Sequence, residues 1–454
     1  MKTTSNFFCK ECGYESAKWM GKCPSCNSWN SFEEEIISKS KNSKSMSSKT
    51  GFLEKTEIKK LEEIKVEEAS RVDVGFEELN RVFGSGIVKG SISLVGGEPG
   101  IGKSTLIMQV CGNLSKVGKV LYVSGEESES QVKLRADRLK VASPSIFFLN
   151  ETNISEVENK VESLNPEFCI VDSIQTMYDD EIASTSGSVS QVKEVTARLM
   201  YLAKRKNITM IVIGHVTKDG VIAGPRVLEH MVDTVIYIEG DRFSENRIVR
   251  SVKNRFGSTN EIGIFVMKNE GMVEVKNKSE TFLGDKEENT SGSATSVTTE
   301  GSSNIFFEVQ ALTAHSYYNL PRRVANGIDF NRLNMIVAVL EKKCNLSLGS
   351  NDIYVSALGG LKVNDPSSDL ATAISIYSSF KNVIIPNDIL FVGEIGLTGE
   401  IRNVANIEKK VKEAVRMNYK KIYCSKYDAI KVKKEINNEN IIGVSNLMEL
   451  INIL

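Results

Sequence analysis

The sequence lacks any hydrophobic run long enough to cross a membrane. No stretch of about 18 uninterrupted apolar residues occurs, and the opening letters MKTTSNFFCKEC contain no apolar core of a signal peptide. An excess of one charge is lacking as well, because 57 Lys and Arg oppose 58 Asp and Glu for a formal net charge of -1. We therefore expect a cytoplasmic protein without a membrane partner, in which any contact with nucleic acid relies on local basic segments.

Cysteine is scarce and unevenly spread, with eight in the chain. A disulfide framework is not expected in a reducing compartment. The first four follow the spacing C-x2-C-x10-C-x2-C, which places four thiolates around one zinc ion without an open position: Cys9, Cys12, Cys23 and Cys26. A dithiol redox pair is the alternative, but no βαβ pattern surrounds these residues. The other four stand singly in apolar surroundings and are expected to be buried: Cys111, Cys169, Cys344 and Cys424.

A chain of 454 residues is too long for one ordinary core, and two shifts in composition divide it. The first segment is rich in Ser and Lys, and the second is rich in Ser, Thr and Gly. Neither shows a hydrophobic period. The expected division is a four-cysteine zinc finger at 1–35, a flexible linker at 36–61, a central domain at 62–275, a second linker at 276–304 and a C-terminal domain at 305–454.

The central block alternates short apolar runs with longer helical stretches. Continuous β-branched runs of this kind are typical of strands that are buried on both faces, which predicts an α/β fold with a mostly parallel sheet. The expected strands are 91–95, 120–124, 168–172, 210–214 and 234–238. The C-terminal block is also mixed, with expected strands at 353–358 and 389–392 and helices at 369–380 and 407–417, and is predicted to be α+β.

A glycine-rich loop follows the first of these strands. It matches G-x-x-x-x-G-K-[ST] in the required strand, loop, helix context, so its backbone N–H groups are expected to bind the phosphates of ATP. Lys103 would reach the β- and γ-phosphates, and the Ser104 hydroxyl would ligate magnesium. The predicted nucleotide-binding residues are Gly97, Glu98, Pro99, Gly100, Ile101, Gly102, Lys103, Ser104 and Thr105.

Polar residues follow three further strands of the block. Asp172 ends an apolar strand and is expected to hold the magnesium shell. Glu126 follows the strand at 120–124 and is the preferred base for the attacking water; Glu127 is the alternative, and both acids could instead only cap the next helix. His215 stands where a side chain could sense the γ-phosphate, although a single His is often structural.

These motifs resemble the ATPase core of the RecA superfamily, through the run from Val74 to Gly90 and the phosphate loop. With the four-cysteine knuckle, the pentapeptide Lys253-Asn-Arg-Phe-Gly257 and a C-terminal block similar to the Lon protease domain, the order resembles the bacterial RadA (Sms) family. The resemblance implies a ring-forming, homo-hexameric, DNA-stimulated ATPase of recombination and repair. It implies single-stranded and branched DNA as substrates of branch migration, and a recombinase or helicase as a partner.

The resemblance also assigns roles to basic residues. Lys253 and Arg255 fit a position at a subunit boundary, where a cation stabilises γ-phosphate charge in a neighbour's site; a basic strand end before a turn is the plain alternative. Two loops without aromatic residues, 179–191 and 217–226, correspond to the DNA-binding loops of RecA-like proteins. Lys218 and Arg226 are the expected phosphate contacts, so that binding is directed at the DNA backbone.

The C-terminal block, aligned with the Lon protease domain, places Ser368 at the nucleophile and Glu408 where the base lysine would stand. Lys409 follows, but one residue along a helix is a turn of about 100°, and Asp369 replaces a small residue. We therefore expect a proteolytically inactive scaffold. Its basic residues Arg322, Arg323 and Lys362 either contact duplex DNA or form a solvated face.

Two other functions remain open on the sequence. A RecA-like core could be a regulatory ATPase that binds protein partners, although such proteins lack the zinc knuckle and the KNRFG pentapeptide. A nucleotide-binding block joined to a Lon-like block could also be an ATP-dependent protease, against which the absence of a lysine at Glu408 argues.

Overall fold

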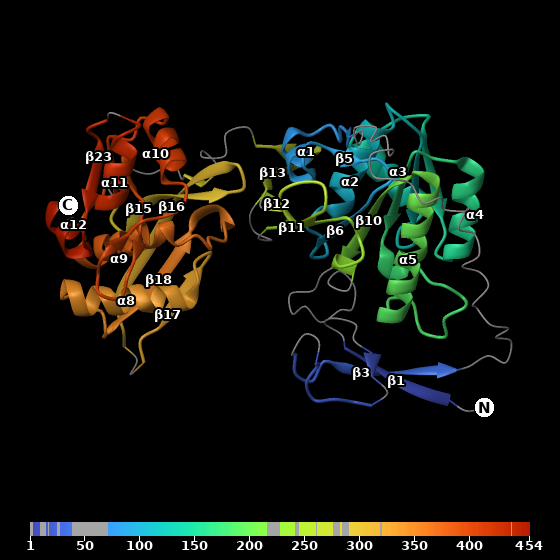
Figure 1. The fold of residues 1–454 in the computed structure, drawn as a ribbon, viewed down its shortest axis with the longest axis horizontal. Helices are drawn as coiled ribbons and strands as arrows, with labels where there is room; N and C mark the ends of the chain where they lie inside the picture. The colour runs from blue at the N-terminus through green and yellow to red at the C-terminus, as the bar shows by residue number, and fades with distance from the viewer. Residues whose placement is uncertain are drawn as a thin grey trace, which may run out of the picture. The chain divides into compact units, whose positions relative to one another are not determined.

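The computed structural model describes residues 3–9, 15–16, 18–24, 28–38, 71–215, 228–240, 245–259, 261–275, 282–283, 290–317, 320–436 and 438–454. The chain divides into two compact units, Met1–Glu239 with Arg247–Glu274, and Gly240–Asn246 with Val275–Leu454. Figure 1 shows the elements of each unit as a ribbon. In the part of the chain that is described, no helix is long and apolar enough to cross a membrane.

The N-terminal module is a three-stranded antiparallel sheet in the order β2-β1-β3, formed by β1 (Thr3–Cys9), β2 (Glu15–Ser16) and β3 (Phe32–Ser38). Its core is small: Cys9, Cys23 and Phe32 are buried together, with Phe7 and Met20 packed against them. The predicted linker at 36–61 begins inside β3, and its remainder, 39–61, lies outside the described residues.

The larger part of the first unit is organised around a nine-stranded sheet in the order β14-β13-β12-β11-β6-β10-β9-β7-β8. The pairs among β11, β6, β10, β9, β7 and β8 are all parallel, while β11–β12 and β13–β14 are antiparallel. The strands are β6 (Ile92–Gly97), β7 (Val120–Ser124), β8 (Ile146–Asn150), β9 (Phe168–Asp172), β10 (Thr209–His215), β11 (Thr234–Glu239), β12 (Asn246–Asn254), β13 (Ile262–Lys268) and β14 (Gly271–Glu274). A separate antiparallel pair, β4 (Arg71–Val72) and β5 (Ile87–Val88), precedes them.

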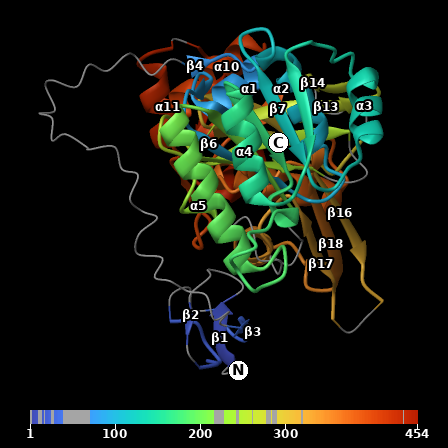
Figure 2. The same cartoon turned by 90° about the vertical axis from the view of Figure 1, so that its right-hand side faces the viewer.

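Helices cover both faces of this sheet, as Figures 1 and 2 show. One buried cluster joins a face of the sheet to α1 (Glu77–Phe83), α2 (Lys103–Leu114) and α3 (Glu129–Arg138). The other face packs on α4 (Ile154–Leu164) and α5 (Val189–Lys206). The mostly parallel α/β fold predicted from the continuous apolar runs is confirmed, since β6, β7 and β9 are buried along their whole length.

The C-terminal unit has a mixed seven-stranded sheet in the order β17-β18-β16-β15-β19-β22-β23. Helix α9 packs across β15 and β16, and a second cluster joins the sheet to α10 and α11. The bounds are β15 (Ser293–Glu300), β16 (Ser303–His315), β17 (Arg323–Asn326), α8 (Phe330–Cys344), β18 (Asn351–Ala357), α9 (Asp369–Lys381), β19 (Ile389–Phe391), β20 (Glu394–Ile395), β21 (Ile401–Arg402), α10 (Ile407–Arg416), β22 (Lys421–Ser425), α11 (Lys426–Lys433), β23 (Ile441–Val444) and α12 (Leu447–Ile453).

Several strands were not among those expected from the sequence, and two are instructive. Strand β8 was missed although its first four residues, Ile146 to Leu149, are a continuous apolar run, and its side chains are half-buried or exposed. Strand β15 occupies residues predicted as a linker at 276–304, since its Ser, Thr and Ala side chains looked like a polar connection. Pairing with β16 buries most of this strand, so small β-branched residues here are sheet residues.

Candidate active site

Four neighbouring strands, β6, β10, β9 and β7, carry the predicted site residues at one edge of the central sheet. His215 at the end of β10 is in register with Gly97 at the end of β6, and Ser124 at the end of β7 is in register with Asp172 at the end of β9. Parallel strands present their carboxyl ends at the same edge, which is where ligands of open α/β sheets bind. The strand order therefore brings together residues that lie far apart in the sequence.

The phosphate loop joins β6 to α2 through a backbone that only glycine adopts without strain. Gly102 has a φ of +111°, and a Cβ there would come within 2.4 Å of the Met267 side chain. The loop ends at the N-terminus of α2, where backbone N–H groups and the helix dipole favour an anion.

Lys103 is the first residue of α2, and only 3% of its surface is exposed. Its ammonium donates hydrogen bonds to two carbonyl oxygens, Gly97 O at 2.9 Å and Glu98 O at 3.0 Å. Burial lowers the pKa of Lys103 to about 8, although the nearby charges of Asp172 and Glu126 oppose this shift. Its hydrogen-bond partners here are neutral carbonyls, which leaves a positive charge available to a phosphate.

Asp172 is buried at the end of β9, and its carboxylate is positioned by a residue of the neighbouring strand. The Tyr122 hydroxyl donates a hydrogen bond to Asp172 Oδ2 at 2.5 Å. Burial is the main cause that raises the pKa of Tyr122 well above its ordinary value, so the phenol stays a donor. One carboxylate oxygen is thus held by Tyr122.

Glu126 faces the other polar residues of the edge. Its carboxylate lies 3.2 Å and 3.3 Å from His215 Nε2, and it accepts a hydrogen bond from the Ser173 hydroxyl. The hydrogen bond with His215 is the main cause that lowers the pKa of Glu126, so this side chain is ionised at neutral pH. Glu126, Ser173 and His215 form a cluster that a water molecule could enter.

Glu127 points elsewhere, because it forms an ion pair with Arg135 of α3. Neither acid caps that helix: Ser128 is the N-cap, and it forms a capping box with Gln131. The geometry thus separates two adjacent acids, one at the cluster with His215 and one in an ion pair.

Lys253 and Arg255 are not brought to this edge. Lys253 pairs with Val235 near the start of β11, and the backbone N–H of Arg255 bonds to Asp233 O just before the amino end of that strand. Lys253 donates to the carbonyls of Glu229 (2.7 Å) and His230 (3.1 Å), while the Arg255 guanidinium lies 3.0 Å from Asp233 Oδ1. Within one chain these cations therefore lie at the amino end of β11, whereas Gly97 pairs with Ile238 near the carboxyl end of that strand.

The two loops predicted to bind DNA differ in what the structure describes. The second, with Lys218 and Arg226, lies outside the described residues. The first is tied to α5, because Gln191 Nε2 donates to three loop carbonyls, those of Asp179, Ile182 and Ser184. Asp179 itself forms an ion pair with Arg198 at 2.7 Å. The glycine and serine content of this loop gave no indication in the sequence that Gln191 holds it.

The predicted zinc ligands lie partly within the described residues. Cys9 and Cys23 are both fully buried in the small core of the N-terminal module, while Cys12 and Cys26 fall outside. Two thiols that converge in one core fit the tetrahedral thiolate set of a structural zinc ion. The four single cysteines are buried as expected, and burial raises the pKa of Cys169 to about 12.

The C-terminal unit corrects the assignment of a nucleophile and a base. The Ser368 hydroxyl donates to Asp365 O, and Glu408 forms an ion pair with Lys431 at 2.5 Å. Instead Lys410, fully buried on α10, donates to Ser367 Oγ at 3.0 Å and to Asp365 Oδ2 at 2.5 Å. The serine that meets a lysine is thus Ser367, one residue before the predicted Ser368. The lysine is Lys410, two residues after the predicted Glu408, because α10 begins at Ile407 and turns Lys410 toward the interior.

This serine and lysine pair is arranged as a closed ionic cluster. The Ser367 hydroxyl donates to Val297 O at 3.0 Å and is fully buried. Burial alone would raise the pKa of Asp365, but the charge and hydrogen bonds of Lys410 outweigh it, so this pKa is held below its ordinary value. Burial lowers the pKa of Lys410, and the charge and hydrogen bond of Asp365 oppose this shift. Because Ser367 and Lys410 are both fully buried and already hydrogen-bonded, the pair is closed to a peptide substrate in this structure.

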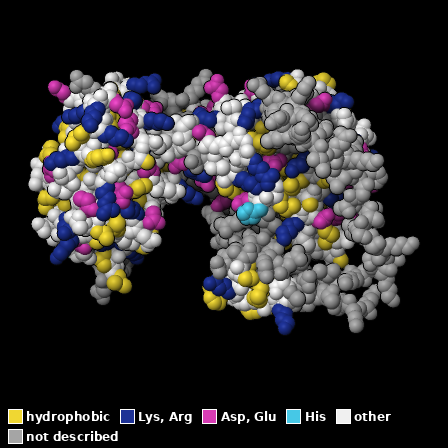
Figure 3. Space-filling view, viewed as in Figure 1, with side chains coloured by type: hydrophobic (Ala, Val, Ile, Leu, Met, Phe, Trp, Pro, Cys, Tyr) yellow, Lys and Arg dark blue, Asp and Glu magenta, His cyan; other side chains and the backbone are white. Residues whose placement is uncertain are grey.

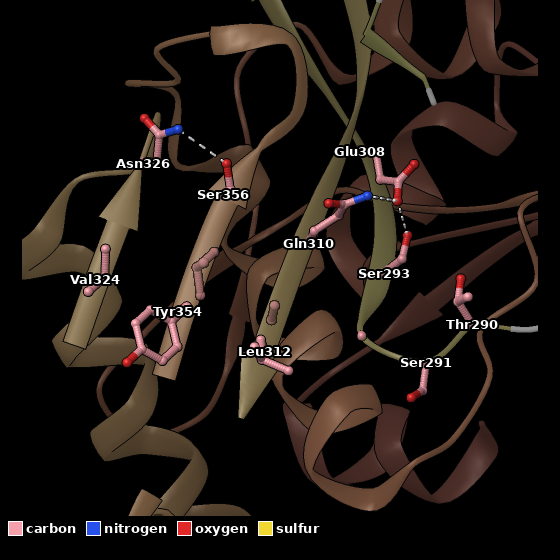
Figure 4. Close-up of a pocket in the computed structure, with 13 residues that line it drawn as sticks. Thr290, Ser291, Ser293, Glu308, Gln310, Leu312, Val324, Asn326, Tyr354 and Ser356 are labelled. Atoms are coloured by element: carbon pink, nitrogen blue, oxygen red, sulfur yellow. Dashed lines mark hydrogen bonds between the residues drawn. The ribbon is translucent and has the colours of Figure 1, made fainter. Parts of the chain in front are cut away.

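A separate pocket of about 510 Å³ opens on the sheet face of the same unit. Figure 4 shows its lining, in which Glu308 accepts hydrogen bonds from Ser293 (2.6 Å) and Gln310 (3.0 Å), while Tyr354 and Val324 stand on the neighbouring strands. Of the basic residues named in the sequence analysis, Arg323 donates to backbone carbonyls of Asn351 and Leu348. Among the residues that line the pocket, Glu308 is acidic and none is Lys or Arg.

Three residues at the nucleotide edge were missed by sequence reasoning. Tyr122 and Ser173 hold Asp172 and Glu126, and Arg247 of β12 donates to the phosphate-loop carbonyl of Ile101 at 3.0 Å. A tyrosine inside an otherwise aliphatic buried strand was a usable signal for the first. No local pattern marks Arg247, since its place depends on an antiparallel strand far along the chain.

A phosphate loop on a parallel sheet, with an acid on a nearby strand and a carboxylate beside it, defines a P-loop ATPase. Family models match at residues 7–34 (rubredoxin metal binding domain), 58–221 (AAA domain) and 330–428 (subunit ChlI of Mg-chelatase). The chain is 48% identical over 451 residues to the DNA repair protein RadA of Listeria monocytogenes, covering 99% of this chain and 97% of the relative. It is also 48% identical to that of Bacillus subtilis, covering 99% and 98%, and 46% identical to that of Streptococcus pyogenes serotype M1, covering 99% of both.

The chain belongs to the DNA repair protein RadA family, and the family resemblance found in the sequence is confirmed. It is a nucleotide-binding, ATP-hydrolysing enzyme.

Proposed function

We propose that this chain is a DNA-dependent ATPase of recombination and repair, which binds single-stranded and branched DNA and promotes branch migration. The three parts proposed for it are a zinc finger at 1–35, an ATPase domain at 62–275, and a scaffold domain that covers the predicted 305–454 and also includes β15. The observation that carries the proposal is the edge of the central sheet, where Lys103, Glu126, Asp172 and His215 meet. The names of the relatives, DNA repair proteins, support the choice of DNA as the effector.

The proposed role of Lys103 follows from its surroundings. A buried ammonium that donates to carbonyl oxygens gains a charge-assisted partner when a phosphate enters. The loop residues Gly97 to Gly102 would wrap the phosphates with backbone N–H groups, and Ser104 and Thr105 would complete the binding loop at the start of α2. The nucleotide is thus bound before any chemistry begins.

Glu126 is proposed to orient and deprotonate the attacking water. Its carboxylate is ionised and lies beside His215, so a proton taken from water meets a base that is held by two neighbours, Ser173 and His215. His215 would report the state of the γ-phosphate through this contact. Glu127 is less suited to the role, since Arg135 occupies it.

Two metals fit the residues present. Asp172 and Ser104 would hold magnesium, which supplies neutralisation of the phosphate charge when bound. Tyr122 leaves the second oxygen of Asp172 for that purpose. Cys9, Cys12, Cys23 and Cys26 would hold zinc, which supplies folding energy to a module whose own core is small.

A homo-hexameric ring is the proposed assembly, in which Lys253 and Arg255 serve the site of a neighbouring subunit. Their position away from the edge that carries Lys103 supports this, because they cannot complete the site of their own chain. Lys218 and Arg226 would contact the phosphates of DNA in the channel, with a recombinase or helicase as a further partner. A proteolytic role is not supported by the buried, carboxylate-paired state of Lys410.

The test is the rate of ATP hydrolysis with and without single-stranded DNA, beside digestion of casein. We expect stimulation by DNA and no proteolysis. Glu126→Gln should lower the turnover number by about 10²- to 10⁴-fold while ATP still binds, and Glu127→Gln is the matched control, with a much smaller loss. A chain that hydrolyses ATP without any response to DNA would instead be the regulatory ATPase, and casein digestion would indicate the protease.

A further inference from the structure

Both tryptophans of the chain, Trp19 and Trp29, lie on the surface of the N-terminal module. Their exposed fractions are 53% and 71%, whereas Trp is on average among the well-buried residues. The same module buries Phe32 and packs Phe7 and Met20 into its core. The core of this module does contain aromatic side chains, and yet the two tryptophans lie outside it.

The two rings are presented by one short hairpin. Asn30 N donates to Gly21 O at 2.8 Å, and Lys22 pairs with Trp29 as an antiparallel bridge. The ring of Trp19 lies against the backbone of Gly21, where a Cβ would be only 3.7 Å from Trp19 Cη2. The backbone pairing places Lys22 beside Trp29, and Trp19 lies three residues before Lys22 on the same strand of the hairpin.

Positive charge accompanies the rings. The Lys22 ammonium lies 5.5 Å from the centroid of the Trp29 ring, in a cation–π contact. In the ranges 18–24 and 28–32 the charged residues are Lys18 and Lys22, both exposed, and three acidic residues, Glu33, Glu34 and Glu35, follow in β3. Figure 3 shows hydrophobic and basic side chains next to one another on the described surface of this module.

We propose that the N-terminal module is a base-stacking site for single-stranded DNA, in which Trp19 and Trp29 stack on unpaired bases and Lys18 and Lys22 contact phosphates. The proposal rests on the proposed function, since it takes DNA as the effector. Every base has a π face, so stacking of this kind is tolerant of sequence. The module supplies what the ATPase loops lack, because neither 179–191 nor 217–226 contains an aromatic residue.

Single strands are favoured over the other ligands of an aromatic surface. In a duplex the base faces are occupied by neighbouring base pairs, which leaves tryptophan nothing to stack on. A protein partner would use the rings as an apolar anchor, but it gains nothing from two flanking ammonium groups unless it is acidic. Rings interleaved with lysines match a chain of alternating bases and phosphates.

The decisive measurement is the intrinsic tryptophan fluorescence of the full zinc-loaded chain. Because both tryptophans belong to this module, the signal reports on it alone. We expect oligo-dT to quench the fluorescence in a saturating manner, with the same midpoint as the anisotropy of a labelled oligo-dT measured in parallel. A duplex of equal length should quench much less.

Variants assign the effect to each ring. Trp19→Ala and Trp29→Ala should each weaken oligo-dT binding by roughly 5- to 150-fold, while Trp29→Phe restores most of the affinity. Lys22→Gln should reduce the slope of log affinity against log salt by roughly 0.7. Tyr427→Ala is the matched control, an equally exposed aromatic residue of the C-terminal unit, and should leave the affinity unchanged. Zinc content, measured for each variant, shows that the module still folds.

The outcomes separate this proposal from the proposed function. If labelled oligo-dT binds and stimulates hydrolysis but the tryptophan fluorescence does not change, base stacking is wrong and the DNA-dependent ATPase stands. Equal quenching by duplex and single strand also overturns stacking. If no oligonucleotide binds the chain at all, the proposed function fails together with it.

Discussion

The two units of the chain each bury a lysine, and the partners of the two ammonium groups differ. Lys103 in the ATPase unit is held by two carbonyl oxygens, which are neutral. Lys410 in the C-terminal unit is held by the Asp365 carboxylate and the Ser367 hydroxyl. A buried charge with neutral partners is a site for an anion, whereas a buried charge with its own counter-ion is already satisfied. The comparison shows that the partner of a buried lysine, not its burial, decides what it can bind.

Removing the first lysine should have the largest effect on activity. Lys103→Ala takes away the charge that faces the β- and γ-phosphates, and we expect the turnover number for ATP to fall on the order of 10³-fold. Steady-state hydrolysis measures this, with circular dichroism as a check on folding. Lys116→Ala, at an exposed lysine in the same unit, is the control. If Lys103→Ala hydrolysed ATP at a normal rate, the two lysines would not differ in the proposed way.

Removing the second lysine should affect stability and not hydrolysis. Lys410→Met leaves Asp365 without its counter-ion, which should lower the free energy of unfolding by about 3–5 kcal/mol, measured by denaturant titration of the C-terminal transition. Lys412→Met on the same helix is the matched control, because its exposed ion pair with Glu435 is screened by solvent and its loss should barely change stability. Unchanged stability of Lys410→Met would contradict the ionic cluster.

The pH dependence of nucleotide binding should be visible near the pKa of Lys103. With a pKa of about 8 in the nucleotide-free chain, the ammonium is present below pH 8 and is lost as the pH rises through this value. Since phosphate binding requires the ammonium, the affinity for ATP should fall by up to about tenfold per pH unit above 8. A fluorescent ATP analogue measures this. Lys103→Arg should bind more weakly at neutral pH but with a flat profile, because guanidinium stays charged.

A smaller effect is expected when the hydrogen bond from Tyr122 to Asp172 is removed. Tyr122→Phe removes the hydrogen bond to Asp172 Oδ2, a loss of about 1.5–3 kcal/mol for a bond to a charged group. We expect the apparent affinity for magnesium in the hydrolysis assay to fall by about tenfold or more, with the fold intact. Tyr178→Phe, at a tyrosine in the loop after β9, is the control. If magnesium dependence is the same in both variants, Tyr122 does not position Asp172.

Much of the nucleotide edge could be predicted from the sequence, because a phosphate loop, a strand ending in Asp172 and a strand followed by Glu126 are local patterns. The side chains that hold them could not, since Tyr122, Ser173 and Arg247 reach the site through strand order. The C-terminal cluster was misassigned for a related reason. Which face of α10 is buried depends on where the helix begins, and a shift of two residues exchanged Glu408 for Lys410.

The carbonyls that hold Lys253 belong to Glu229 and His230, only a few residues after the segment 217–226 that was predicted to contact DNA. Two hydrogen bonds therefore join the Lys253 side chain of β12 to the chain just before β11. In the proposed ring, these bonds would couple the proposed DNA-contacting segment to the proposed subunit-boundary cation without any change in the sheet.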